Sequence, residues 1–475
     1  MSTAASQLFG GRLNVVNIGL SMFEDDIRSQ GAPVRTLDWT PPGGGKPEVI
    51  AALDKLSEPA IAARIEAANA EAVERIKSAQ PMLVGFGRAL DVVPGMTPTT
   101  ILHAGPPVAW EDMSGPMKGA VTGALVFEGL AKDLDDAARV AASGSITFSP
   151  CHEHQCVGSM AGVTSPSMYM HVVRNETHGN YAFTNLSEQL AKILRMGAND
   201  QSVVDRLVWM RDVLGPMLKE AVELTGPIDL RLMLAQALHM GDEAHNRNIA
   251  GTVLLFQALA PGLLQSSFTE AQKKEVFDFI ASSDYFSGPT WMATAKAALD
   301  AAHGIEGSTI VTTMARNGVE FGVRVSGLPG NHWLTGPAQK VIGPMFAGYR
   351  PEDSGLDIGD SAITETYGFG GFAMAAAPAI VALVGGTVEE AMAYTRDMAL
   401  ITTDQNPNVT IPALGFQGIP TGIDVRKVLE TGIVPIINTA IAHKEAGIGM
   451  IGAGITHPPV DCFEKAIIAL ADRLG

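Results

Sequence analysis

Cysteine and charge are both scarce in this chain, and their scarcity excludes several classes of protein. Only 3 of the 475 residues are cysteine, too few for the disulfide framework of a small secreted scaffold. Charged residues make up 17% of the chain and hydrophobic residues 46%, whereas a disordered chain has the opposite balance. The sequence is therefore that of a large folded protein. We expect three or four domains at this length and a reducing, cytoplasmic location.

Positive charge is also in short supply. The chain has 33 Lys and Arg against 50 Asp and Glu, a formal net charge of −17, and no run of five basic residues. A nucleic-acid-binding protein needs a basic face that releases counterions from the phosphate backbone. We therefore expect no nucleic-acid partner, although local basic pockets can still bind small anions.

Several familiar sequence signals are missing as well. The chain contains no G-x-S-x-G, no P-loop and no H-E-x-x-H motif, which argues against the enzyme classes built on them. Its start lacks a charged region followed by a long apolar one, so we expect no secretion signal. The apolar stretch 368–386 is interrupted by glycines and Pro378, and we predict a buried helix there, not a membrane span.

What is present begins with a short strand–helix–strand pattern. Residues 14–20 and 34–39 predict two strands, separated by a short helix that ends at Gly31. Parallel strands require such a crossover, so the pattern indicates a βαβ unit. From about 186 to 303 the pattern changes to successive helices, and Asn317-Gly318 between apolar runs predicts a β-hairpin.

A cluster of Cys and His is the first group of residues that could carry chemistry. Cys151, His152, His154 and Cys156 are residue types that bind zinc, and on a strand residues 152 and 154 face the same side. Their spacing, however, matches no common structural zinc pattern. The cluster therefore has three interpretations: a pocket histidine, a structural loop, or a metal site.

The segment MGDEAHNRN (240–248) is the second group. We expect it on a helix, where Asp242, His245 and Asn246 share one face and Glu243 and Arg247 share another. Burying these charges is costly unless they are paired. Because the flanking sequence is apolar, the polar residues face a cavity, a partner or another helix, unless they form a solvated face with a Glu–Arg pair.

Two glycine-rich blocks follow in the C-terminal third. The block 359–372 places Asp360, Ser361, Thr364, Glu365 and Thr366 before a Gly turn. Free backbone N–H groups at such a helix start can bind an anion.

The second block, 442–454, contains a literal G-x-G-x-x-G at Gly447, Gly449 and Gly452. A dinucleotide site needs a strand before that motif, and here we expect a helix over residues 437–447. Close backbone packing or an anion-binding loop is therefore favoured over NAD.

Three arginines lie among apolar residues: Arg316, Arg324 and Arg426. A guanidinium group binds carboxylate or phosphate with two parallel hydrogen bonds. Each arginine is thus a candidate anion site, and a structural ion pair is the alternative for each.

Six long blocks, in order along the chain, are ILHAGPPVAWEDMSGPMKGA (101–120), FSPCHEHQCVGSMAGVTSPSM (148–168), MGDEAHNRN (240–248), MARNGVEFGVRVSG (314–327), GDSAITETYGFGG (359–371) and GIDVRKVLETGIVPIINTAIAHKEAGIGMIGAG (422–454). Together they resemble the YlbE-like family, whose members are encoded beside FdrA-like proteins and carbamate kinases. One member is linked to oxamate carbamoyltransferase, a multi-subunit enzyme of allantoin breakdown. The N-terminal segment also resembles the tail of FdrA-like proteins, which suggests that it docks against a related domain.

The resemblance implies a multidomain α/β fold. Combined with the element pattern, it predicts a small Rossmann-like βαβ domain with a linker helix at 1–100, a mixed α/β domain at 101–190, a helical insert domain at 191–303, and an α+β domain with glycine-rich loops at 304–475. It also implies a reaction: phosphorolysis of oxalurate to oxamate and carbamoyl phosphate, or the reverse. The Ser-Thr-Arg-Thr loop of aspartate and ornithine carbamoyltransferases is absent.

Carbamoyl transfer requires acid–base groups, oxyanion donors and groups that bind anions. We expect the segments 151–160, 242–248, 316–317, 360–368 and 443–452 to meet at one cleft, with no cofactor and no metal. The acid–base candidates are His152, His245, Glu243 and Glu365. The candidates for binding substrate or anion are Arg247, Asn248, Arg316, Asn317, Lys444, Gly449, Ser361 and Thr366.

Two alternative functions remain open at this point. The Cys/His cluster favours an amidohydrolase that cleaves a related amide or ring with metal-activated water. The Gly/Ala-rich helices and the N-terminal module favour a non-catalytic scaffold subunit of an FdrA-like complex. In each case we expect a homo-oligomer and a small anionic amide or ureido acid, with phosphate or carbamoyl phosphate, as ligands.

Overall fold

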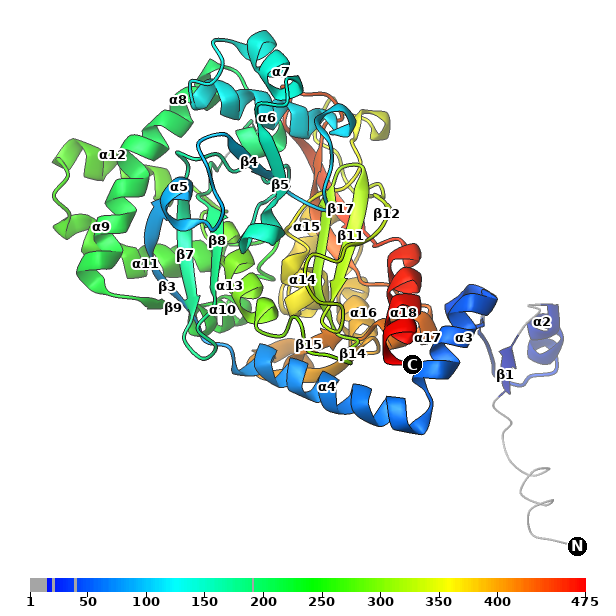
Figure 1. The fold of residues 1–475 in the computed structure, drawn as a ribbon. Helices are drawn as coiled ribbons and strands as arrows, with labels where there is room; N and C mark the ends of the chain where they lie inside the picture. Colours follow the sequence, from blue (N-terminus) through cyan, green and yellow to red (C-terminus); the bar gives the residue numbers. More distant parts are fainter. Residues whose placement is uncertain (1–14, 19–21, 38–40, 190–191) are drawn as a thin grey trace, which may run out of the picture.

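A computed structural model describes residues 15–18, 22–37, 41–189 and 192–475. Several small β-sheets with helices packed against them form the molecule (Figure 1), which confirms the predicted mixed α/β class. The two largest sheets lie in different halves. Helix α4 (Pro59–Ser78) contacts both halves, through α13 on one side and β14 on the other.

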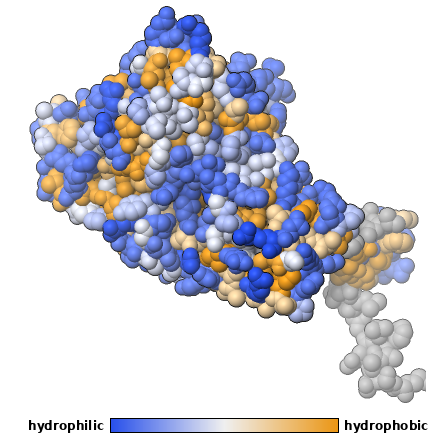
Figure 2. Space-filling model, in the orientation of Figure 1, coloured by the Kyte–Doolittle hydropathy of each residue, from blue (hydrophilic) through white to orange (hydrophobic). Residues whose placement is uncertain are grey.

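The N-terminal module consists of β1 (Val15–Ile18), α2 (Met22–Ser29) and β2 (Val34–Leu37). β1 and β2 pair in parallel, as the βαβ pattern predicts, and the outer ends of both predicted strands lie outside the described residues. The pair forms a sheet of its own, so the structure shows a βαβ unit and not a full Rossmann-like domain. Figure 2 shows apolar surface at this end of the molecule, where large side chains are 50–64% exposed: Val16, Ile18, Met22 and Phe23.

A five-stranded sheet organises the first half of the molecule. Its strand order is β6-β8-β7-β3-β9, and its central pair β3 and β7 is antiparallel. The strands are β3 (Pro81–Arg88), β6 (Cys156–Val157), β7 (Tyr169–Asn175), β8 (Tyr181–Asn185) and β9 (Ile228–Asp229). A separate parallel pair lies beside it, formed by β4 (Thr100–His103) and β5 (Thr147–Pro150).

Helices fill most of 201–300 as predicted, but the described residues from 186 to 200 contain only a 3-10 turn at Leu194–Met196 where the sequence predicts a helix, and the helices do not stand apart as a domain. β9 lies among them and pairs with β3, and one hydrophobic core continues from α4 through the sheet to α13. The structure thus joins the predicted helical insert to the sheet. The helices of this half are α6 (Gly115–Phe127), α7 (Leu134–Ala142), α8 (Gln201–Trp209), α9 (Gly215–Thr225), α10 (Leu230–His239), α11 (Ile249–Gln265), α12 (Glu270–Ala281) and α13 (Gly288–Asp300).

A four-stranded sheet, ordered β12-β11-β10-β13, organises the second half. β10 (Val311–Asn317) and β11 (Glu320–Val325) form the predicted hairpin at Asn317-Gly318. The Asn317 side-chain oxygen accepts the backbone N–H groups of residues 319 and 320, which closes the turn. The outer strands are β12 (Leu334–Pro337) and β13 (Ile358–Gly359).

Two further hairpins lie in the C-terminal part: β14 (Thr402–Ile411) with β15 (Gln417–Ile423), and β16 (Ile437–Ala442) with β17 (Met450–Thr456). The helix predicted over 437–447 was wrong, because residues 437–442 form β16. The helices of this part are α14 (Ile363–Tyr367), α15 (Val381–Val384), α16 (Val388–Met398), α17 (Val425–Thr431) and α18 (Val460–Leu474), while α3 (Pro47–Leu56) belongs to the N-terminal linker and the short α5 (Ala89–Val92) follows β3 in the first half.

The stretch 368–386 is not one helix. It forms short 3-10 turns at 370–372, 374–376 and 378–380 followed by α15, because its glycines and Pro378 do not sustain an α-helix. The stretch is largely buried between α16 and the C-terminal hairpins. Across the described part of the chain, no helix combines the length and the apolar character that crossing a membrane requires.

Candidate active site

The segment 240–248 is a loop between α10 and α11, not the predicted helix. Glu243 shapes this loop, since its carboxylate accepts the backbone N–H groups of His245 (3.1 Å), Asn246 (2.7 Å) and Arg247 (2.6 Å). Such local side-chain-to-backbone bonds compete with helix formation, and Ala244 takes the left-handed conformation at φ 65°. Burial raises the pKa of Glu243 to about 7. Glu243 therefore holds the loop and does not itself line a cavity.

The loop presents His245 to Glu365 of α14. Nδ1 of His245 lies 2.7 Å from Oε1 of Glu365, and both side chains are almost fully buried. Glu365 is in turn held by the backbone N–H of Gly371 (3.0 Å) and the hydroxyl of Thr364 (3.0 Å). A carboxylate at Nδ1 fixes the tautomer of the ring. Nε2 is thereby left for the cavity that His245 lines.

This cavity has a volume of about 140 Å³, room for about five water molecules at the liquid volume of each. It lies where the two halves of the molecule meet. Segments far apart in the sequence form its wall, among them the region after β6, the loop 240–248, the start of α14 and strand β16. Its polar lining includes Ser159, Arg195, His245, Tyr285, Ser361 and Thr439.

Arg316 lies behind the wall of this cavity, fully buried. Its guanidinium forms a two-pronged ion pair with Asp357 at 2.6 and 2.8 Å. The same group donates to the hydroxyl oxygens of Ser361 (3.4 Å) and Thr439 (3.2 Å). Because both hydroxyls accept from Arg316, their own hydrogens are free to point toward a ligand. Arg316 thus acts on the cavity through two hydroxyl groups.

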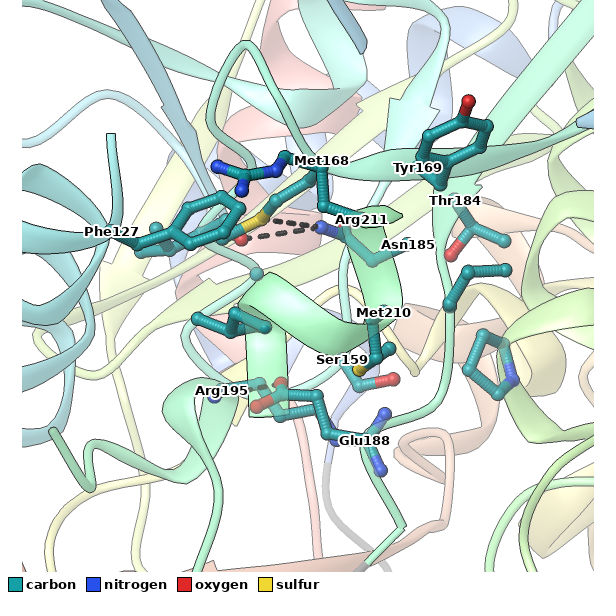
Figure 3. A pocket seen from close by; sticks show the side chains of 15 residues that line it. Phe127, Ser159, Met168, Tyr169, Thr184, Asn185, Glu188, Arg195, Met210 and Arg211 are labelled. Atoms are coloured by element: carbon teal, nitrogen blue, oxygen red, sulfur yellow. Dashed lines mark hydrogen bonds between the residues drawn. The ribbon is translucent and has the colours of Figure 1, made fainter. Parts of the chain in front are cut away.

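A second cavity adjoins the first and shares Ser159 and Arg195 with it. Figure 3 shows Arg195 and Glu188 close to Ser159, with Phe127 and Tyr169 on other sides. The Arg195 guanidinium stacks over the Tyr285 ring at 5.3 Å. Burial raises the pKa of Glu188.

Arg195, Tyr285, Ser159 and Thr439 are lining residues that the sequence did not reveal. Arg195 stands alone between apolar residues in KILRMG (192–197), in a stretch that reads as an amphipathic helix. The one sequence signal for Arg195 is a single arginine among apolar residues. Thr439 lies on β16, in a segment whose sequence predicts a helix.

His152 lies outside both cavities. Neither of its ring nitrogens has a hydrogen-bond partner among the described residues, and Nε2 lies 3.6 Å from Oδ1 of Asp360. Burial, with the charges of Lys296 and Arg324, holds the pKa of His152 well below its usual value. Asp360 accepts the backbone N–H groups of Gly105 (2.8 Å) and Gly158 (2.9 Å), and burial raises its pKa to about 7.

The Cys/His segment is a 3-10 turn rather than a strand. The ring of His154 bonds to the carbonyl of Pro94 (2.6 Å) and to Ser149 (2.8 Å), and the Cys151 thiol donates to the carbonyl of Gly162. Within the described ranges, no three His, Cys, Asp or Glu residues are grouped as metal ligands. His154 and Cys151 are thus occupied with bonds to the fold, whereas His152 is not.

The other predicted anion-binding residues lie apart from the cavity. Arg247 donates to the carbonyl of Gly241 (2.9 Å), and Asn248 donates to the carbonyl of His245 (2.7 Å). Thr366 bonds within its own helix. Asn317 closes a hairpin, as described above.

Lys444 donates to the carbonyl of Glu352 at the surface, and Gly449 lies in the turn between β16 and β17. Arg426 forms an ion pair with Asp424 and Glu66, while Arg324 stacks on Trp333. Of the predicted residues, His245 and Ser361 line the cavity; Glu365 and Arg316 contact those that do.

Comparison with known proteins places this site in context. The family described as oxamate carbamoyltransferase subunit AllG matches residues 146–361. The Escherichia coli (strain K12) protein oxamate carbamoyltransferase subunit AllG is 47% identical over 411 residues, covering 86% of this chain and 98% of the relative. A second protein of that strain, the uncharacterized protein YahG, is 69% identical over 471 residues, covering 99% and 100%.

A solved structure is also similar. The crystal structure of a conserved protein of unknown function from Enterococcus faecalis V583 has 70% sequence identity and a TM-score of 0.87, covering 88% of this chain and 100% of that one. The matched range 146–361 includes Arg195, His245 and Ser361 of the cavity wall.

Proposed function

Because the chain belongs to the family of oxamate carbamoyltransferase subunit AllG, we propose that it is a subunit of an enzyme that transfers a carbamoyl or related acyl group between phosphate and a small amide or ureido acid. The cavity at the junction of the two halves is the proposed reaction site. The expected partner is an FdrA-like subunit in a cytoplasmic, oligomeric complex. The exposed apolar side chains of the N-terminal module support contact with another chain.

The proposed reaction is the phosphorolysis of oxalurate or a close analogue. An oxygen of phosphate attacks the ureido carbonyl carbon, and a tetrahedral oxyanion forms. The bond from that carbon to the amide nitrogen then breaks, and the nitrogen takes up a proton as oxamate leaves with carbamoyl phosphate as the second product. The site must therefore stabilise an oxyanion and deliver a proton.

The cavity wall supplies both functions. We assign proton transfer to Nε2 of His245, which takes the proton of the attacking hydrogen phosphate and delivers it to the leaving nitrogen, while Glu365 orients the ring through Nδ1 at 2.7 Å. We assign oxyanion stabilisation to the hydroxyls of Ser361 and Thr439, whose hydrogens Arg316 directs away from itself. The reverse reaction uses the same groups, since His245 then takes the proton from the amide nitrogen. The observation that carries the proposal is this buried His–Glu pair at a cavity with two oriented hydroxyls.

The first prediction concerns His245. In the complete complex, His245→Asn should lower kcat for carbamoyl phosphate release from oxalurate by roughly 100- to 10,000-fold, because the proton donor is lost. The assay is phosphate-dependent formation of carbamoyl phosphate, by the chain alone and with its partner subunits. The matched control is His239→Asn, at an exposed position whose ring bonds to Thr410, and it should retain wild-type turnover.

The outcomes separate the candidate functions. Wild-type kcat in the His245→Asn complex would show that this chain is a scaffold and that the chemistry belongs to its partner. Release of product in water without phosphate would indicate an amidohydrolase. Neither turnover nor binding of oxalurate by the chain, alone or in its complex, would reject the carbamoyl-transfer proposal.

A further inference from the structure

A buried guanidinium that forms no direct ion pair lines the proposed reaction site. Arg195 is 8% exposed, and its Nε has no hydrogen-bond partner. Among the described side chains, its hydrogen-bond partner is the Ser187 hydroxyl, at the long distance of 3.5 Å from Nη2. A buried charge of this kind is costly to the fold unless something neutralises it.

The nearest candidate for that role, Glu188, is already occupied. Its carboxylate accepts the backbone N–H groups of Leu194 (2.7 Å) and Arg195 (3.3 Å). Glu188 therefore holds the turn that carries Arg195, and the charge of Arg195 partly offsets the effect of burial on the Glu188 pKa, but the two groups form no direct ion pair. The side chain of Arg195 lines both adjoining cavities, so a ligand in either one meets it.

The surroundings of Arg195 suit a planar anion. Tyr285 covers one face of the guanidinium at 5.3 Å, which leaves the edge with its N–H donors available. That edge matches a carboxylate, which accepts two parallel hydrogen bonds. Of the described residues that line the larger cavity, Arg195 alone carries a permanent positive charge. One guanidinium balances a carboxylate but leaves a phosphate dianion half neutralised.

We propose that Arg195 binds the carboxylate of the small acid amide on which the enzyme acts, and so selects anionic amides over neutral ones. The identity of that amide rests on the proposed function. With the carboxylate on Arg195, the amide end of the molecule extends into the cavity toward His245, Ser361 and Thr439. Arg195 is thus the specificity-determining residue of the site.

The test compares oxamate with oxamide, its neutral counterpart in which a second amide replaces the carboxylate. Dissociation constants are measured by calorimetry for the full chain, alone and assembled with its partner subunits. We expect the wild type to bind oxamate more tightly than oxamide. Arg195→Gln should weaken oxamate binding roughly 10- to 100-fold and abolish the preference, and should raise KM for oxamate far more than it lowers kcat.

Arg206→Gln is the matched control. Arg206 also stacks on an aromatic ring, Phe279 at 5.7 Å, and donates to the carbonyl of Glu188, but it lines neither of the two cavities. It should bind oxamate as the wild type does. If Arg195→Gln does not fold, Arg195→Lys serves instead: its point charge should keep the preference for oxamate while weakening binding, because it lacks the planar pair of donors.

Several results would overturn the inference. Unchanged oxamate binding in Arg195→Gln, or in Arg195→Lys where that is the variant used, would do so. So would a variant that loses affinity for inorganic phosphate but not for oxamate, which would assign Arg195 to phosphate. Absence of oxamate binding by the wild type in both forms would also reject it.

The proposed function can fail separately. Wild-type turnover that Arg195→Gln leaves intact would refute the role of Arg195 while the carbamoyl-transfer proposal stands. Arg195-dependent oxamate binding by a complex without carbamoyl transfer would leave the anion site in place and reject the reaction.

Discussion

Two buried glutamates that are close in space, Glu243 and Glu365, do different work in this molecule. The Glu243 carboxylate accepts backbone N–H groups and so fixes the conformation of the loop 240–248. Glu365 directs one oxygen to an imidazole nitrogen. From the sequence both were equally good acid–base candidates, because residue type alone does not say whether a carboxylate faces main chain or side chain.

The ionisation of Glu243 should make the stability of the protein depend on pH. Burial raises its pKa from the usual 4.5 to about 7, so the folded state keeps a proton that the unfolded state loses above pH 4.5. The stability contributed by Glu243 is therefore present at low pH and declines as the pH rises toward 7.

Glu243→Gln cannot ionise, and its stability should lack this decline. The difference in Tm between Glu243→Gln and the wild type, measured by scanning calorimetry from pH 5 to 8, should shift in favour of the variant as the pH rises. At pH 5 the variant should be the less stable protein by about 1–3 kcal/mol, since its amide faces N–H donors. A difference that stays constant over this range would contradict the prediction.

At the scale of elements, local chemistry predicted some segments well and others not at all. The Asn317-Gly318 hairpin and the N-terminal βαβ unit follow from turn residues and crossover length. The segments 240–248 and 437–447 contain residues compatible with helix, but other contacts decide their form: local bonds from Glu243 to the backbone hold the first as a loop, and β17 pairs with the second. Such contacts are not visible in periodicity.

Gly105 lies where the segment after β4 comes close to the backbone of β10. Gly105, just after β4, has φ +79°, and a Cβ there would lie 2.3 Å from the backbone nitrogen of Asn317. Gly105→Ala should therefore lower the free energy of unfolding by about 3–5 kcal/mol, the combined cost of a left-handed non-glycine residue and of overpacking.

Gly129→Ala separates these two costs. Gly129 has φ +71° with nothing within 4 Å of a Cβ, so this variant meets only the conformational cost. Thermal unfolding of both variants should show the larger decrease in Tm for Gly105→Ala. Equal decreases would mean that the backbone at residue 317 moves aside without cost.

At the scale of the whole molecule, Asp360 ties separate parts together. It precedes α14, and its carboxylate accepts N–H groups from Gly105 after β4 and from Gly158 after β6. Ser159, which follows Gly158, and Ser361, which follows Asp360, both line the main cavity. Asp360 was noted in the sequence only as part of a candidate anion loop, because its two partners lie some 200 or more residues away.

Asp360→Asn should weaken this junction. Its amide oxygen can keep one backbone N–H, but its NH₂ group faces the other donor, which costs about 1–3 kcal/mol. We expect a lower Tm together with a higher KM for the amide substrate. Asp54→Asn, at an exposed position of α3, should change neither quantity; an Asp360→Asn protein with wild-type Tm would show that the junction does not depend on this carboxylate.

The convergence of distant segments on one cavity was partly predictable. Residue chemistry indicated His245 and Ser361, since polar groups inside apolar surroundings need a reason to be there. Residue chemistry could not distinguish them from Arg247, Asn317 or Lys444, which are also polar residues able to bind an anion but which form hydrogen bonds away from the cavity. Arg195 was missed because one arginine in an apolar stretch carries no pattern of its own.

The planar guanidinium of Arg316 connects two segments of the cavity wall. It bonds to a hydroxyl on each of two segments, Ser361 before α14 and Thr439 on β16, while Asp357 clamps it from behind. The Arg316 guanidinium therefore fixes the separation between the Ser361 and Thr439 hydroxyls in the cavity wall. Moving either hydroxyl to admit a larger ligand would also disturb the bidentate ion pair with Asp357, so the stiffness of this part of the wall opposes expansion of the cavity.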